Sequence, residues 1–180
     1  MRIDERMNLV VPLYRDEKIY AYVYSTPVSR EVFEAHYWLI AKTHNKLVEL
    51  DRIAGTKVAV FVLKDVAKKE RAEESCTAFL AEITRLSNAI VATDDGWTTA
   101  PYQAAVDRKM IDMDDAREVD SAIVFFTVGW LMYPLNLRLA LLDGAAPAWN
   151  AEITSLSLTD FSASLKTSTE IVSFGARAAA

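Results

Sequence analysis

The side chains best suited to nucleophilic or metal chemistry in this chain belong to two histidines and one cysteine. His36 and His44 are eight residues apart, so on one helix they do not form the i, i+4 pair that holds zinc. His44 falls within an apolar stripe, which favours a structural histidine. Cys76 lies one turn before two apolar residues and has no local base to lower its thiol pKa. A buried, unreactive thiol is therefore favoured over a nucleophile.

Acidic residues are concentrated between positions 112 and 120, where a calcium or magnesium site is conceivable. An EF-hand loop needs oxygen ligands at alternating positions and a glycine at its sixth position, but Ala116 and Arg117 interrupt that pattern. Acids at the start of a helix are stabilised by its dipole, which explains them without a metal. With five glycines and no phosphate-loop or nucleophile-elbow motif, the sequence predicts no enzyme, no cofactor and no metal. The acids concerned are Asp112, Asp114, Asp115, Glu118 and Asp120.

Residues 122–133 (AIVFFTVGWLMY) form an almost unbroken apolar segment. A helix that is apolar on all sides is buried in its own domain, against a partner or in a membrane. A membrane span needs roughly 20 apolar residues, and acids and Pro134 bound this segment, so no membrane span is expected. Its aromatic side chains are interpreted either as core or as anchors for a partner helix. These side chains are Phe125, Phe126, Trp130 and Tyr133.

Two β-like segments, residues 8–14 and 18–25, predict an N-terminal hairpin with its turn at residues 15–17. Strict alternation in the second segment would place Tyr20, Tyr22 and Tyr24 on one face, a second candidate partner surface. Pro12 suits an edge strand better than a central one.

The remaining pattern is mostly helical. After Ser29, which can cap a helix, apolar and aromatic residues recur at spacings of 4 and 3. The helix that this stripe predicts is expected to end at Gly55. Further helices are expected at residues 57–71, 73–90, 101–110, 112–133, 135–142 and 148–158, and a last turn is expected to end at residue 165. Asp95-Gly96 indicates a possible second short hairpin near residues 91–99. The predicted fold class is mainly α (α+β): one helical domain over residues 1–165 with an N-terminal hairpin, and a flexible tail at 166–180.

Composition limits the classes of partner. The chain has 180 residues, enough for one domain, and a net charge of −5 with cations and acids interspersed. A nucleic-acid face is not expected, because such a face usually shows a basic patch. One cysteine allows no internal disulfide, and the N-terminus lacks the apolar core of a secretion signal. An intracellular, soluble protein is expected.

Five segments resemble a group of proteins from tailed bacteriophages, usually described as tail assembly chaperones of long-tailed phages. The resemblance covers roughly residues 1–170, and its motifs are structural segments without catalytic residues. The segments are MRIDERMNLVVP (1–12), STPVSREVF (25–33), EITRLSN (82–88), DSAIVFFT (120–127) and TSLSLTDF (154–161).

The resemblance implies a non-enzymatic protein in the cytoplasm of the bacterial host. Such chaperones bind the long helical tape-measure protein, keep it soluble and help to recruit tail-tube subunits. The alternative is a structural tail or neck component that stays in the virion, where the Tyr20, Tyr22 and Tyr24 face and self-association would serve ring or tube assembly. The resemblance supplies no active-site positions.

Overall fold

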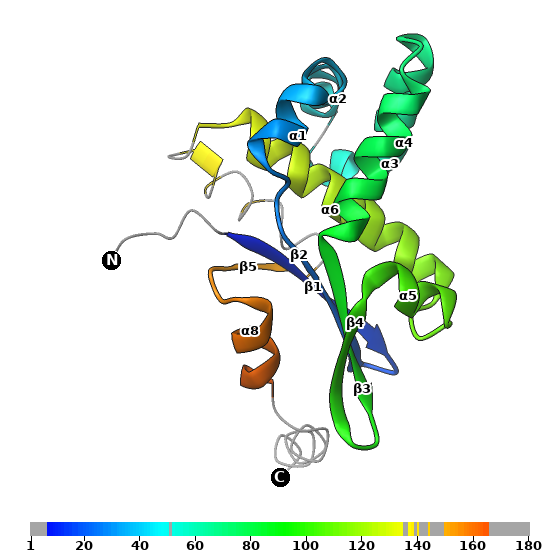
Figure 1. The fold of residues 1–180 in the computed structure, drawn as a ribbon, viewed down its shortest axis with the longest axis vertical. Helices are drawn as coiled ribbons and strands as arrows, with labels where there is room; N and C mark the ends of the chain where they lie inside the picture. The colour runs from blue at the N-terminus through cyan, green and yellow to red at the C-terminus, as the bar shows by residue number, and fades with distance from the viewer. Residues whose placement is uncertain are drawn as a thin grey trace.

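Five strands form one antiparallel sheet with the order β4-β3-β2-β1-β5 (Figure 1). The computed structural model describes residues 7–50, 52–134, 137, 138, 140, 144 and 150–165. The strands are β1 (Asn8–Arg15), β2 (Lys18–Ser25), β3 (Ser87–Thr93), β4 (Gly96–Pro101) and β5 (Glu152–Thr154).

Seven helices are described, and they cover the two faces of the sheet unequally (Figure 1). Six of them form a layer above one face, and the short α8 lies on the opposite side. The helices are α1 (Arg30–Ala35), α2 (Tyr37–Glu49), α3 (Arg52–Lys69), α4 (Glu73–Arg85), α5 (Tyr102–Asp107), α6 (Met113–Met132) and α8 (Leu158–Ser164).

The predicted fold class, a mainly helical domain with one or two separate hairpins, is wrong, because both hairpins belong to one sheet in an α/β fold. β2 pairs antiparallel with β3, with Ala21 opposite Val91 and Tyr22 opposite Ile90. The helix predicted over residues 73–90 ends at Arg85, and Ile90 lies in β3. Ala89 and Val91 are buried in the main core and Ile90 in the smaller core on the other face of the sheet, so this apolar run satisfies a central strand as well as a helix.

The N-terminal hairpin has the predicted position, with Asp16 and Glu17 as its two-residue turn. Both have positive φ angles, 49° and 62°, as the tight turn of a twisted hairpin requires. β5 pairs with β1 only through Asn8–Val10. Pro12 therefore lies in the part of β1 that β5 leaves as an edge, in agreement with the expectation for a proline.

Two further helix predictions are corrected. Gly55 does not end a helix but lies inside α3, where a Cβ atom would sit 3.4 Å from the Leu47 carbonyl oxygen and 3.5 Å from the Phe125 ring. Its role is close helix packing. The helix predicted over 148–158 is replaced, in its described part, by β5 and the start of α8. The predicted tail at 166–180 and most of the predicted 135–142 helix lie outside the described residues.

The main core lies between the sheet and the helical layer, with α6 passing through it. Ala122, Val124 and Phe126 of α6 are almost wholly buried, as are Leu9 and Val23 on the facing side of the sheet. A smaller core on the other face joins Val10, Tyr24 and Ile90 to Phe161 of α8. The apolar segment at 122–133 is thus largely interior.

Candidate partner-binding surfaces

The predicted aromatic anchors of α6 divide between the core and its margin. Phe126 is 1% exposed and Trp130 6% exposed, so both belong to the interior. Phe125 and Tyr133 are half-buried, and the Tyr133 ring packs on His44 with 4.9 Å between centroids. Arg138 covers the end of the helix, because its guanidinium lies 4.8 Å from the Trp130 ring centroid. None of the four presents a large open surface.

The three tyrosines of β2 do not share one face, contrary to the alternation prediction. A register shift opposite Leu13 and Tyr14 places an extra residue in β2, and a bulge of this kind re-aims a side chain. Tyr22 and Tyr24 pack against Phe161 of α8, with ring centroids 5.5 and 6.2 Å apart. Tyr20 packs on the helical side, against the core of that layer.

Each of these tyrosine hydroxyls lies in partly buried surroundings. Tyr20 donates a hydrogen bond to Asp115 Oδ2 at 2.5 Å, and Tyr24 donates to the Leu156 carbonyl at 2.8 Å. Burial raises the pKa of Tyr20, Tyr22 and Tyr24, since it disfavours a phenolate. They act as neutral structural groups on both faces of the sheet.

The candidate nucleophile and ring bases are also placed in packed positions. Burial raises the pKa of the Cys76 thiol, which keeps it protonated and weakly nucleophilic. His36 Nδ1 lies 2.7 Å from Ser75 Oγ, and its ring packs on Phe79. Burial lowers the pKa of His44 despite the opposing effect of Asn45. The three groups are explained by packing.

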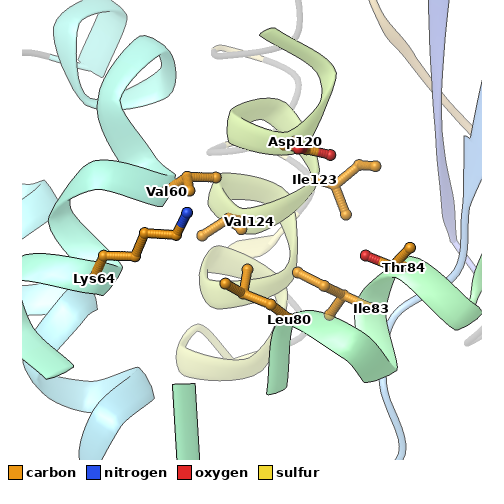
Figure 2. A pocket seen from close by; sticks show the side chains of 8 residues that line it. All are labelled: Val60, Lys64, Leu80, Ile83, Thr84, Asp120, Ile123 and Val124. Carbon is orange, nitrogen blue, oxygen red and sulfur yellow. The ribbon is translucent and has the colours of Figure 1, made fainter. Parts of the chain in front are cut away.

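A cavity of about 100 Å³ lies between α3, α4 and α6 (Figure 2). Lys64 extends from α3 toward the space between the helices, and Asp120 borders it from α6. The Tyr102 hydroxyl donates to Asp120 Oδ1 at 3.0 Å. Burial raises the pKa of Asp120, while the hydrogen bond and the positive charge of Lys64 act in the opposite direction. The other lining residues are Val60, Leu80, Ile83, Thr84, Ile123 and Val124.

Five apolar side chains line this cavity together with one ammonium, one hydroxyl and one carboxylate group. At about 100 Å³ it is smaller than the pockets that usually bind small molecules, and it has room for one side chain.

The most exposed aromatic group lies at the junction of α1 and α2. Phe33 and Tyr37 pack edge to face with centroids 5.6 Å apart, and Tyr37 packs on Trp38 at 5.3 Å. Trp38 remains 74% exposed. We call Phe33, Tyr37 and Trp38 the aromatic ladder. In the sequence, Phe33 and Tyr37 belong to the helical stripe with spacings of 4 and 3 that follows Ser29. The available signal was Trp38, which falls outside the 3-and-4 spacing of that stripe.

A second exposed feature follows one side of α3. Phe61 is 71% exposed, and Lys57, Lys64 and Lys68 are exposed around it at spacings of 4, 3 and 4. Residues three and four apart are neighbours on a helix surface. We call these four residues the basic stripe. The sequence predicted no basic patch, because cations and acids are interspersed along the chain, so the stripe was missed.

The described ranges contain neither a candidate metal site nor a candidate membrane-spanning helix. There, no group of three or more histidine, cysteine, aspartate or glutamate side chains is arranged to hold a metal ion. None of the described helices combines the length and apolar composition that crossing a membrane requires.

The described residues thus present two exposed surfaces, the aromatic ladder and the basic stripe. Comparison with protein-family models, with curated proteins and with solved structures gives no match for this chain.

Proposed function

We propose that this protein is a tail assembly chaperone of a long-tailed bacteriophage. In this role it binds the tape-measure protein in the host cytoplasm, keeps it soluble and helps to recruit tail-tube subunits. The five segments described above support the lineage. The observation that carries the binding role is the aromatic ladder, with Trp38 74% exposed at its end.

An exposed tryptophan beside a tyrosine has the chemistry of a binding anchor. Trp and Tyr are enriched among the residues that dominate interface energies. Burial of apolar surface contributes about 25 cal/mol per Å², and both side chains have area left to bury. The tape-measure protein of such a phage is a long helical chain, and its apolar faces would need cover before assembly. An aromatic ladder on a helix can supply such cover.

Co-expression with the tape-measure protein of the same phage tests this role. The expected result is a larger soluble fraction of tape-measure protein and co-elution of the two chains. Tyr37→Ala together with Trp38→Ala should abolish both effects while circular dichroism stays unchanged. Tyr14→Ala together with Met113→Ala is the matched control, since both side chains are exposed and lie outside the ladder. A tape-measure protein that is equally insoluble with and without this chain would refute the proposal.

The alternative role, a structural component of the tail or neck, makes a different prediction. Its main support was an open tyrosine face on β2, but Tyr22 and Tyr24 pack under α8 and Tyr20 bonds to Asp115. Quantitative mass spectrometry of purified virions separates the two roles. A chaperone should be missing from finished particles, whereas a stoichiometric amount would establish the structural role.

A further inference from the structure

The basic stripe on α3 is turned away from the core. Ala59 and Leu63 on the same helix are 0% exposed, whereas Phe61 between them is 71% exposed. An exposed phenylalanine in the middle of a helix face gains nothing from the fold itself, because its apolar area stays in water. The stripe thus has apolar surface that a partner could cover.

The charges around Phe61 are less compensated than those of the neighbouring helix face. Lys42 pairs with Glu70, Lys46 with Glu49 and Lys69 with Asp65. Within the described residues, the lysines of the basic stripe take part in no ion pair. Three positive charges are therefore grouped on one helix face of a chain whose net charge is −5. The lysines in question are Lys57, Lys64 and Lys68.

The cavity between α3, α4 and α6 adjoins this stripe, because Lys64 belongs to both (Figure 2). Apolar side chains from three helices contribute to its wall, among them Val60, Leu80 and Ile123. The Asp120 carboxylate on this wall already accepts a hydrogen bond from Tyr102. An apolar side chain of a partner can therefore enter beside Lys64 while its acidic neighbours stay near the lysines.

We propose that the basic stripe binds an acidic amphipathic helix of a partner protein. The apolar face of that helix packs on Phe61 and places one side chain in the adjoining cavity. Its glutamate or aspartate residues pair with Lys57, Lys64 and Lys68. Complementary charge speeds association and selects among partners, so the stripe favours acidic helices over neutral or basic ones.

A protein helix fits this surface better than a nucleic acid. The stripe has one exposed aromatic side chain, whereas binding of single strands usually relies on several stacking platforms along a basic groove. A helix with both apolar and acidic faces matches the alternation of Phe61 with the lysines.

Fluorescence anisotropy with a defined probe tests the inference. The probe is a labelled helical peptide with leucines on one face and glutamates on the others, and its counterpart has lysines in place of the glutamates. The full-length protein should bind the acidic peptide, with affinity falling as salt rises, and should bind the basic peptide much more weakly. Equal binding of both peptides, or no binding of the acidic one, overturns the proposal.

Variants assign the binding to the stripe. Replacing Lys57, Lys64 and Lys68 together by glutamine should weaken binding of the acidic peptide roughly tenfold, in keeping with three exposed charge pairs. Phe61→Ala should weaken it while leaving its salt dependence in place. The matched control changes three exposed cations elsewhere to glutamine and should bind as the unaltered protein does. The control positions are Lys18, Arg108 and Lys109.

Two outcomes separate this inference from others. If a single-stranded DNA oligonucleotide binds more tightly than the acidic peptide and loses affinity in the lysine variant, the stripe is a nucleic-acid surface and the proposal is wrong. The inference goes beyond the chaperone proposal and does not depend on it. Tyr37→Ala with Trp38→Ala should leave peptide binding unchanged, so failure of the tape-measure experiment and failure of this one are distinguishable.

Discussion

The hydroxyl of Tyr20 donates a 2.5 Å hydrogen bond to Oδ2 of Asp115, which joins the N-terminal hairpin to the first turn of α6. Arg15 strengthens the same junction, because its guanidinium lies 4.5 Å from the Tyr20 ring centroid and 2.8 Å from Asp112 Oδ2. The register shift at Leu13 and Tyr14 is what aims Tyr20 toward α6. Hairpin and central helix are thus held together by one irregular position in β2.

Tyr20→Phe tests the energetic weight of this junction. Removing the hydroxyl should lower the free energy of unfolding by about 1 kcal/mol, below the usual range for a hydrogen bond to a charged group because the site is partly exposed. Urea denaturation measures the change. Tyr14→Phe removes the hydroxyl of an exposed tyrosine at the neighbouring position and should leave the midpoint unchanged. Equal midpoints for both variants would show that the bond contributes nothing.

Phe126 and Phe61 provide a matched pair for separating core from surface. Phe126→Ala should cost about 3–5 kcal/mol of stability, because it opens a cavity in a well-packed interior. Phe61→Ala should change stability by less than about 0.5 kcal/mol, since its ring is largely in solvent. Denaturant unfolding with circular dichroism decides this. A large loss for Phe61→Ala would mean that this ring supports the fold and would weaken its assignment to a binding surface.

His44 should make stability depend on pH. Both its ring nitrogens are shielded from solvent, and burial lowers its pKa from the ordinary value of 6.5. Below that value the unfolded chain binds a proton that the folded chain does not. The free energy of unfolding should therefore fall as the pH drops below 6.5, until the pH passes the folded pKa. Above 6.5 the group has no such effect.

The comparison is between the unaltered protein and His44→Phe, which keeps an aromatic ring against Tyr133. The urea midpoints at neutral and mildly acidic pH should differ less for the variant than for the unaltered protein, because the histidine contribution is gone. His36→Gln retains His44 and should keep that step. An identical pH dependence in His44→Phe would assign the effect to other groups.

Local structure could be predicted from the sequence where it depends on residues that are neighbours along the chain. The place of the first hairpin, the Ser29 cap and the start of α5 after Pro101 follow from local backbone preferences, although the hairpin turn has two residues and not the predicted three. Ser29 accepts a hydrogen bond from the Val32 N–H, as a cap should. The apolar excess of residues 122–133 also predicted burial, which the structure confirms for most of α6.

Pairings between distant segments were not predictable in the same way. Residues 89–91 form an apolar run that suits either a helix or a buried strand, and only the pairing with β2 on one side and β4 on the other makes it a strand. The short β5 depends entirely on its pairing with β1. Gly55 looked like a helix end, but contact with Leu47 and Phe125 explains it.

For the candidate surfaces too, residue types could be read from the sequence, whereas exposure depended on the tertiary structure. Residue types alone predicted aromatic side chains as candidate partner contacts. Which aromatic side chains reach solvent was decided by tertiary packing: Phe126 and Trp130 fill the interior, Tyr22 and Tyr24 lie under α8, and Trp38 and Phe61 remain open. The sequence by itself determined the turns, the caps and the central apolar helix, because these depend on near neighbours. Only the tertiary structure decided the sheet and the exposed faces, because burial depends on which distant segments meet.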